Sequence, residues 1–342
     1  MKLKVLAGVL IVAATTAWAQ VGELYNAHVE EQTTISDPAA ALDAAAGDWV
    51  AFSAPALAGT RSPCCWKGKW SGFGEVGCSL ETTHQSYGTR SESPLAENII
   101  IFARADGPGL SGMRVVGEAC PVDAEGATVT WIGNVDEQAG IDWLQATAVA
   151  TSHDSVGDSA LYALAMHRSD VASQRLYSLA LKQDDDYSEE AVFWLGEARG
   201  EAGFQILKKL LAELPKGDTR REINFALTLN DSPDAADTLI QISRADADPE
   251  QRGEALFWLA EEFPDQAKDI LLERLNSEQD EEVLEEAIFA ISELPGTMGS
   301  QILLTLARDE SKSREMRRQA IFWLANSDDD SGVEGLIELL TQ

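Results

Sequence analysis

The residues with the clearest capacity for chemistry are four cysteines: Cys64, Cys65, Cys78 and Cys120. Two disulfides are the favoured interpretation, since an even number of cysteines in an exported chain usually forms a disulfide framework. A bond between adjacent cysteines would close a strained ring, so two pairings stay open: 64–78 with 65–120, or 64–120 with 65–78. The alternative is a thiol-redox or nucleophilic centre at Cys64 or Cys65, which needs a reduced thiol of lowered pKa and a base such as His84.

The rest of the sequence contains no recognisable catalytic, cofactor-binding or metal-binding motif. It has neither a phosphate-binding P-loop nor a GxSxG nucleophile elbow. The aspartate runs at residues 184–186 and 328–330 lack the alternating ligands and the glycine of an EF-hand loop, and they are typical of solvated turns. The four histidines are too scattered to form a metal cluster: His28, His84, His153 and His167. We therefore expect no enzyme activity, no cofactor and no metal site.

The N-terminus has the three parts of a secretory signal peptide. A lysine-bearing start precedes an apolar run over residues 5–14, and a small-x-small cleavage site ends at Ala19. The apolar run is too short to span a bilayer, and no later segment is long and apolar enough to do so. We predict a signal peptide over residues 1–19 and a protein that is exported, to the periplasm of a Gram-negative cell or as a secreted protein, without membrane insertion.

The chain is strongly acidic, with 342 residues and a formal net charge of −31. A field of this sign repels nucleic acids and anionic lipids, because binding them requires lysine and arginine against phosphates. It favours a basic protein partner or divalent cations, or it serves mainly to keep the surface soluble, which is the interpretation we favour. The hydrophobic fraction of 45% is sufficient for a folded core.

One phrase recurs six times in the C-terminal half of the sequence. Its versions include AVFWL at residues 191–195, ALFWL at 255–259 and AIFWL at 320–324. The central aromatic residues are spaced by 31 to 33 positions, and a leucine follows each of them fourteen residues later. The aromatic residues are Tyr162, Phe193, Phe225, Phe257, Phe289 and Phe322, and the leucines are Leu176, Leu207, Leu239, Leu271, Leu303 and Leu336. Two columns that stay in register over six copies indicate an internal repeat.

Each repeat is predicted to contain two short helices joined by a turn. The first helix carries apolar residues at the aromatic and two positions to either side of it, and the second helix is amphipathic around the leucine. A helix pair of this size cannot bury its own apolar face, so neighbouring pairs must stack into a solenoid. We predict a mainly α fold with an α-solenoid of six helix pairs over residues 157–342, and we expect Phe257 to be buried in the middle of the stack.

The repeats resemble the short HEAT repeats of the phycobilisome lyase type. The resemblance rests on the length of the helix pair, the recurring phrase and the arginine pairs at Arg220-Arg221 and Arg317-Arg318. It implies a HEAT-like fold and, because HEAT arrays usually bind proteins, a binding role. A lyase activity would need a pigment-bearing partner, which nothing in the sequence indicates.

Two further columns bear on the surface of the solenoid. Tryptophan follows the central aromatic at Trp194, Trp258 and Trp323, and alanine fills this position in the alternate repeats. We interpret the alternation as packing of large against small residues, in preference to a row of exposed ligand-binding aromatics. Two positions after the leucine, every repeat has a polar residue: Ser178, Lys209, Gln241, Glu273, Thr305 and Glu338. Because second helices line the concave side of HEAT arrays, this second-helix column is either the surface for the partner or simply the solvated face.

Residues 20–150 have a different character, rich in glycine, proline and tryptophan. Candidate strands lie at residues 48–53, 98–105, 112–118 and 127–132, with a hairpin joining the second to the third. A short helix is expected at residues 38–46, and residues 138–150 are expected to lead into the solenoid. We predict a small β-rich domain stapled by the disulfides, and the order of its tryptophan and cysteine motifs, such as Cys64-Cys65-Trp66, resembles exported bacterial HEAT-repeat proteins. That resemblance implies a two-part architecture and no established chemistry.

The features together favour an exported scaffold for protein–protein interaction that binds a partner through the solenoid. The alternative is an enzyme or thiol-redox module centred on Cys64 and Cys65, with the solenoid as the receptor for its substrate. The number of free thiols separates the two hypotheses.

Overall fold

The computed structural model describes residues 23–67, 75–82, 86–89, 92–106, 109–150, 155–183 and 186–327, together with residues 332, 335 and 337. The predicted signal peptide, His84, His153, Leu336 and Glu338 lie outside the described residues, as do most of both aspartate runs. The chain divides into two compact units, Met1–Ser169 and Asp170–Gln342.

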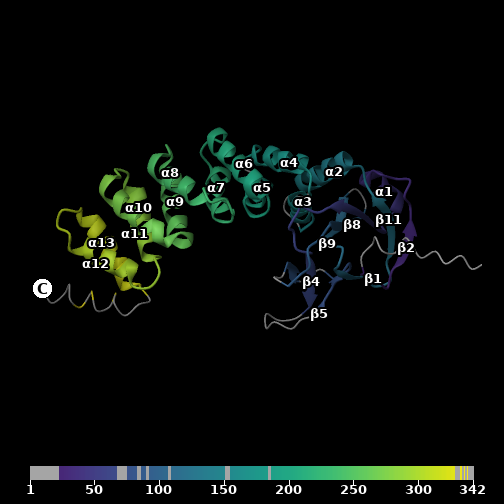
Figure 1. Cartoon of the computed structure of the whole chain (residues 1–342), viewed down its shortest axis with the longest axis horizontal. Coiled ribbons are helices and arrows are strands. Elements are labelled where there is room, and N and C mark those ends of the chain that lie inside the picture. The colour runs from purple at the N-terminus through teal and green to yellow at the C-terminus, as the bar shows by residue number, and fades with distance from the viewer. Residues whose placement is uncertain are drawn as a thin grey trace, which may run out of the picture. The chain divides into compact units, whose positions relative to one another are not determined.

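The largest sheet of the first unit has five strands (Figure 1). In spatial order they are β2 (His28–Glu31), β11 (Thr128–Asn134), β3 (Trp49–Pro55), β8 (Asn98–Asp106) and β9 (Gly109–Gly117). The last four correspond to the four predicted strands, and β8 and β9 form the predicted hairpin. The parallel pairing of β11 with β2 and β3 was not predicted, because these strands are far apart in the sequence.

Both faces of this sheet are covered, which explains the continuous apolar run in β8. Ile99, Ile100, Ile101 and Phe102 are each at most 1% exposed. Successive side chains of a strand point to opposite faces. One face, with Ile100 and Phe102, belongs to the core cluster that contains the cysteines. On the other, Phe52 of β3 meets Trp143 edge-on at a centroid distance of 5.7 Å.

Three helices complete the first unit: α1 (Pro38–Ala45), α2 (Glu137–Ala150) and α3 (Ser155–Met166). The helix α1 corresponds to the predicted short helix and begins with Asp37, which accepts a hydrogen bond from the backbone N–H of Ala39. The helix α2 covers the segment that was expected to lead into the solenoid. The helix α3 carries Tyr162 and is the first helix of the first predicted repeat, although it belongs to the first compact unit.

Two small sheets surround the cysteines. One is parallel, in the order β1 (Glu23–Tyr25), β10 (Pro121–Asp123) and β6 (Cys78–Ser79). The other is antiparallel, in the order β5 (Glu75–Val76), β4 (Cys64–Lys67) and β7 (Ser86–Gly88). Because strands of two or three residues cannot be stable alone, the disulfides must hold these sheets in place.

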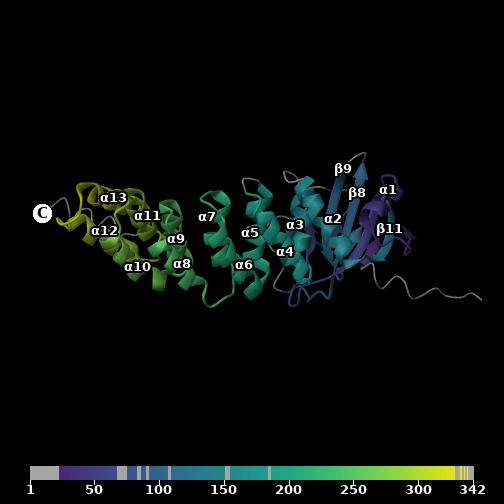
Figure 2. The same ribbon diagram turned by 90° about the horizontal axis from the view of Figure 1, so that it is seen from above.

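The second unit consists of helices, arranged in successive pairs (Figures 1 and 2). The helices are α4 (Asp170–Ala180), α5 (Asp186–Ala198), α6 (Gly200–Glu213), α7 (Asp218–Thr228), α8 (Ala235–Ala245), α9 (Pro249–Glu262), α10 (Pro264–Ser277), α11 (Glu281–Ser292), α12 (Met298–Arg308) and α13 (Arg314–Ala325). The helices α5, α7, α9, α11 and α13 are the first helices of predicted repeats, and α4, α6, α8, α10 and α12 are second helices. The second helix of the sixth repeat falls mostly outside the described residues. The mainly α fold with a β-sheet region before it is confirmed.

The core of the helical unit is built from three columns of the repeat. The register leucines Leu176, Leu207, Leu239, Leu271 and Leu303 have no exposed surface. The same is true two positions before the aromatic, at Ala191, Ile223, Ala255, Ala287 and Ala320, and two positions after it, at Leu195, Leu227, Leu259, Ile291 and Leu324. Close approach of the helices requires small residues: a Cβ on Gly196 of α5 would lie 2.2 Å from the carbonyl oxygen of Ala226 in α7.

Buried ion pairs tie the first helix of a repeat to the turn after its second helix. Arg220 of α7 pairs with Asp246 at 2.5 Å, and Arg252 of α9 pairs with Glu278 at 3.1 Å. Arg274, which breaks the apolar column of the second helices, is itself buried and also pairs with Glu278. The arginines near the start of the first helices therefore fix the geometry of the repeat.

In the part of the chain that the structure describes, none of the helices has the length and apolar character needed to cross a membrane.

Candidate binding surface

A continuous row of aromatic rings runs along the first helices of the second unit, from α5 to α13. We call it the aromatic row, and its members are Phe193, Trp194, Phe225, Phe257, Trp258, Phe289, Phe322 and Trp323. Each ring contacts the next: the centroid distances between successive rings range from 4.6 Å for Phe225–Trp258 to 6.1 Å for Phe193–Phe225. Eight rings on five helices thus form one uninterrupted surface feature.

The predicted burial of Phe257 is wrong, because the aromatic column faces away from the core. Phe257 is half-buried, and the corresponding Phe322 is 57% exposed. An α-helix turns by about 100° per residue, so residues two before and two after a position lie side by side, nearly opposite to it. The fully buried Ala255 and Leu259 therefore direct Phe257 outward.

The tryptophans were predicted to pack over the alternating alanines in the interior, but the structure places them against phenylalanines at the surface. Trp258 of α9 lies against Phe225 of α7 at 4.6 Å, and Trp323 of α13 lies against Phe289 of α11 at 4.8 Å. The indole thus covers the phenylalanine of the preceding repeat, while the alanines in the alternate repeats are fully buried. The tryptophans themselves stay partly exposed.

A column of acidic residues accompanies the row, three positions before each phenylalanine. We call it the glutamate column: Glu190, Glu222, Glu254 and Glu286, with Gln319 in the sixth repeat. It lies on the same side of the helices as the aromatic row, since a step of three residues is nearly one turn. Trp194 Nε1 donates a hydrogen bond to Glu190 Oε1 at 3.0 Å, whereas Glu254 Oε2 is buried and has no hydrogen-bond partner among the described residues.

The glutamates of this column are held in an environment that disfavours their charge. Burial raises the pKa of Glu222 to about 7, and the nearby Glu189 and Glu254 carboxylates add to the shift. Desolvation likewise raises the pKa of Glu254, against the opposing charge of Arg221, and that of Glu286. A cationic group brought to this face would favour the ionised carboxylates and restore their ordinary pKa.

An open groove follows the row over its C-terminal repeats. One hollow of about 520 Å³ is lined by Glu254, Phe257 and Phe289, and a second of about 470 Å³ is lined by Phe289, Phe322 and Trp323. Both hollows also share Glu286, so they form one groove across α9, α11 and α13. The groove is therefore lined mainly by aromatic and acidic side chains, together with Arg221 and Arg318.

The second-helix column is a mixed polar surface. Ser178 and Thr305 donate their hydroxyls to backbone carbonyls of their own helices, at 2.8 and 2.9 Å. Lys209 Nζ lies 4.0 Å from the ring centre of Tyr177, and Glu273 pairs with Arg244 at 2.5 Å. Gln241 is exposed, and Glu338 lies outside the described residues. Most of these polar groups are therefore already engaged by other groups of the solenoid. A role of this column in binding a partner stays a prediction.

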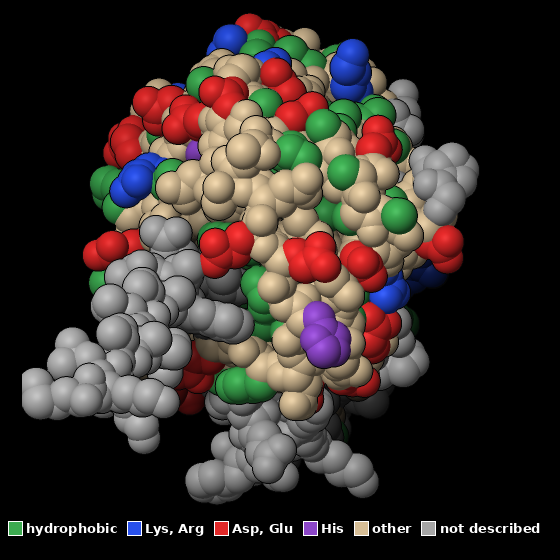
Figure 3. All heavy atoms as spheres, turned by 90° about the vertical axis from the view of Figure 1, so that its right-hand side faces the viewer, with side chains coloured by type: hydrophobic (Ala, Val, Ile, Leu, Met, Phe, Trp, Pro, Cys, Tyr) green, Lys and Arg blue, Asp and Glu red, His purple; other side chains and the backbone are tan. Residues whose placement is uncertain are grey.

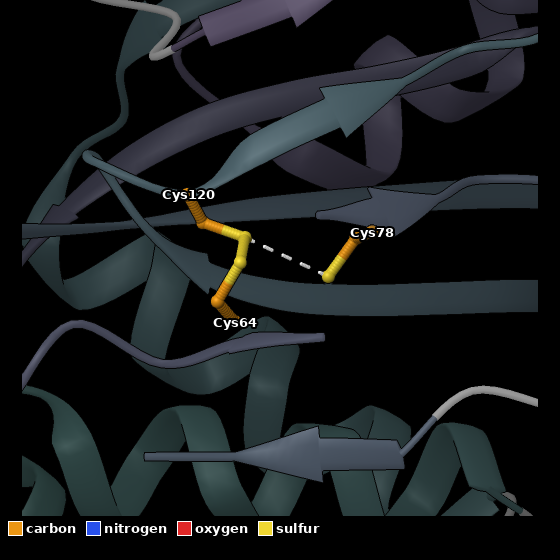
Figure 4. A group of neighbouring side chains, drawn as sticks. All are labelled: Cys64, Cys78 and Cys120. Atoms are coloured by element: carbon orange, nitrogen blue, oxygen red, sulfur yellow. Dashed lines mark hydrogen bonds between the residues drawn. A yellow bond between two sulfur atoms is a disulfide. The ribbon is translucent and has the colours of Figure 1, made fainter. Parts of the chain in front are cut away.

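All four cysteines form disulfides, Cys64–Cys120 and Cys65–Cys78, which is one of the two pairings left open by the sequence. Figure 4 shows the first bond with Cys78 beside it, where the sulfurs of Cys120 and Cys78 lie 3.7 Å apart. Since disulfide sulfurs carry no proton, this is a packing contact between the two bonds. The four residues are between 1% and 7% exposed. The sulfurs of Cys64, Cys78 and Cys120 lie close together, but they could bind a metal ion only after both disulfide bonds were reduced.

This arrangement gives no support to a thiol-redox centre at Cys64 or Cys65, because neither residue offers a thiolate. Of the described histidines, His28 is exposed on β2, whereas His167 is 3% exposed and accepts a hydrogen bond at Nδ1 from the backbone N–H of Ser169, at 3.0 Å. Neither lies among the cysteines in the core cluster.

Acidic side chains are also spread over the first unit. The face shown in Figure 3 carries aspartate and glutamate in several places and few lysine or arginine side chains. The negative charge of the chain is therefore not confined to the groove.

The glutamate column was not predicted from the sequence, although its signal is as regular as that of the aromatic residues. Glu190, Glu222, Glu254 and Glu286 are spaced by 32 residues, in register with Phe193, Phe225, Phe257 and Phe289. The polar positions of the first helices carry this signal, whereas the predicted partner surface lay on the second helices.

Comparison with known protein families decides the nature of the repeats. The HEAT repeats family matches residues 204–292 and 236–315, which together contain the third to fifth predicted repeats and most of the second helix of the second repeat. The helical unit is a HEAT-repeat solenoid. Among curated proteins, no sequence matches the chain.

Two solved structures are among those that the chain matches. Human deoxyhypusine hydroxylase is 14% identical, with 58% of this chain and 88% of that chain covered and a TM-score of 0.27. The CpcE–CpcF complex of phycocyanin lyase from Nostoc is 17% identical, with 57% of this chain and 87% of that chain covered and a TM-score of 0.28.

Proposed function

We propose that the protein is an exported scaffold whose HEAT solenoid binds a protein partner through the aromatic row. The observation that carries the proposal is the continuity of the row: eight rings in mutual contact, ending at Phe322 and its neighbour Ile321, which are 57% and 41% exposed. Extended apolar surface rimmed by polar residues is typical of interaction sites, and aromatic residues are enriched in their centres. No catalytic function is proposed.

Export is the second part of the proposal, and it is supported by the signal-peptide pattern and by the two buried disulfides. Protein purified from its native compartment should begin at Gln20 and should yield the 64–120 and 65–78 bonds in non-reducing peptide mapping. Four free thiols, or a mature chain that keeps residues 1–19, would contradict export and would revive the thiol-redox alternative.

Site-specific photo-cross-linking in the source cells tests the binding surface and does not require the partner to be identified first. A photoreactive phenylalanine analogue replaces Phe322 in one variant and Thr305, in the second-helix column, in a control. Both positions are exposed and lie in the last described repeats, so they differ mainly in the face they present. We expect adducts from position 322 and few from position 305. Adducts from position 305 alone would indicate that the partner binds to the second helices.

A further inference from the structure

The aromatic row offers its occupant apolar contact of a restricted kind. Phe257 and Phe289 stack on each other with ring planes 6° apart, at a centroid distance of 5.6 Å, so much of each ring face is already covered. The ring edges that remain carry partial positive charge and do not attract a cation directly. They do provide apolar surface along which the hydrocarbon stems of lysine or arginine can lie.

The groove supplies the charges that the heads of such side chains require. Glu254 of α9 and Glu286 of α11 line the groove. Glu222 of α7 continues the glutamate column one repeat before it. Burial raises the pKa of all three carboxyl groups, although the charge of Arg221 and the polar N–H groups of Asn224 and Trp258 act against this shift at Glu254. A lysine or arginine placed here would gain a carboxylate partner in a partly desolvated site, where ion pairs are stronger than at an open surface.

The two arginines that line the groove form their ion pairs with acids outside the glutamate column. Arg221 is paired with Asp218 and Glu250, near the N-terminal ends of α7 and α9, and Arg318 is paired with Glu315. The charge of Arg221 also acts on Glu254, so the column is compensated only in part.

The spacing of the column selects the shape of the occupant. Packed neighbouring helices are separated by about 8–10 Å. An extended or polyproline II peptide advances about 3.1–3.3 Å per residue, so it covers about three residues per repeat of the solenoid. In a polyproline II segment, every third side chain also points in the same direction.

We propose that this groove binds an extended segment of a partner protein in which lysine or arginine recurs at every third residue. The inference rests on the proposed function and adds the chemistry of the partner. Each basic stem lies on the aromatic row, and each basic head reaches one glutamate of the column.

The test uses the full mature chain and a blocked peptide of about five Lys-Pro-Ser triplets. One control peptide has the same composition, with the lysines grouped at one end. The other control peptide has glutamine in place of every lysine. Binding is measured by titration calorimetry at low ionic strength, with and without about 0.5 M salt. We expect the triplet peptide to bind, the grouped peptide to bind several-fold more weakly, and the glutamine peptide not to bind.

A pair of matched triple variants locates the site. The first carries Glu222→Gln, Glu254→Gln and Glu286→Gln, and the second carries the same change at the exposed residues Glu201, Glu213 and Glu273 of the second helices. Both lose three carboxyl groups, the titrations are run at about pH 8 so that Glu222 is mostly ionised, and thermal melts verify that both fold. We expect the first to weaken binding by about tenfold or more, and the second to change it by less than about twofold.

Each remaining outcome counts against the inference. Equal losses in the two triple variants would mean attraction by overall charge, and equal binding of the grouped peptide would mean that the spacing is wrong. Absence of binding would contradict the proposal that the partner segment is cationic. If cross-links from position 322 persist in that case, the proposed function stands and the partner has another chemistry, such as an amphipathic helix.

Discussion

Two regions of the solenoid bury glutamate in opposite ways. In the turn after α10, Glu278 accepts hydrogen bonds from the backbone N–H groups of Gln279 and Asp280 and pairs with Arg252 and Arg274. Although burial acts to raise it, these partners lower the pKa of Glu278 to about 2.

On the face of the first helices, Glu222 has no comparable set of partners, and burial raises its pKa to about 7. The solenoid can therefore compensate a buried carboxylate, and it does so where the carboxylate fixes the geometry of a repeat. Burial raises the pKa of Glu222, Glu254 and Glu286 of the glutamate column, beside a row of partly exposed aromatic rings. This difference separates a structural acid from an acid available to a partner.

The largest effect should follow from breaking the compensated site. Glu278→Ala leaves Arg252 and Arg274 buried without their partner and should lower the free energy of unfolding by about 3–5 kcal/mol. Because the pKa of Glu278 is lowered from 4.5 to about 2 in the folded state, its contribution is complete above about pH 4.5 and is lost as the pH falls toward 2. Denaturant unfolding of both proteins at a series of pH values measures this. Glu281→Ala, at an exposed helix start, is the control and should cost a few tenths of a kcal/mol.

Two substitutions in the same turn of α9, one in the core and one in the aromatic row, should lower the free energy of unfolding by different amounts. Leu256 has no exposed surface, so Leu256→Ala should cost about 3 kcal/mol. Phe257→Ala removes a half-buried ring that contacts Phe289 and Trp258, and it should cost about 2 kcal/mol. Chemical denaturation ranks the two variants. A larger loss in free energy of unfolding for Phe257→Ala would indicate that the aromatic column belongs to the core.

Glu222→Gln should stabilise the protein by about 1 kcal/mol at about pH 8, because it removes a half-buried charge that is partly screened by solvent. The folded state keeps its proton up to a pKa of about 7, against an ordinary value of 4.5, so the wild type loses stability as the pH rises through this window. The difference between variant and wild type should vanish below about pH 4.5. Thermal melts at several pH values measure it, and destabilisation at pH 8 would show that Glu222 is compensated after all.

The smallest effect is expected on the second helices. Glu273 is exposed and pairs with Arg244, whose side chain is 44% exposed. Such a pair contributes little, so Glu273→Ala should change the free energy of unfolding by at most about 0.5 kcal/mol. A loss comparable to that of Glu278→Ala would remove the distinction between the two kinds of glutamate.

Much of the fold could be predicted because the repeat is periodic and its burial is nearly all-or-none. The spacing of the leucines predicted amphipathic second helices, and the leucines are their buried residues. The apolar run at residues 98–105 predicted a strand of a hairpin, which is β8. The disulfide pairing could be reduced to two possibilities but not to one, because the choice depends on the parallel sheet that places Cys78 beside β10.

The candidate site was not predicted, because hydrophobicity was equated with burial. Phe257 was assigned to the same face as Ala255 and Leu259, although the pitch of a helix places it on the other side. The raised pKa of Glu222 depends on Glu189 and Glu254 from neighbouring helices, and sequence alone does not show that these carboxylates meet.

Oxidative footprinting tests the central claim, that the aromatic row is the binding surface, most directly. The purified protein is labelled by hydroxyl radicals in buffer and in an extracytoplasmic extract of the source cells, with Tyr25, which is 45% exposed in the first unit, as the internal reference. We expect labelling of Phe289, Phe322 and Trp323 to fall relative to Tyr25 in the extract, while that of Tyr177 on the second helix α4 does not. Protection of Tyr177 with unchanged labelling of the row would contradict the claim.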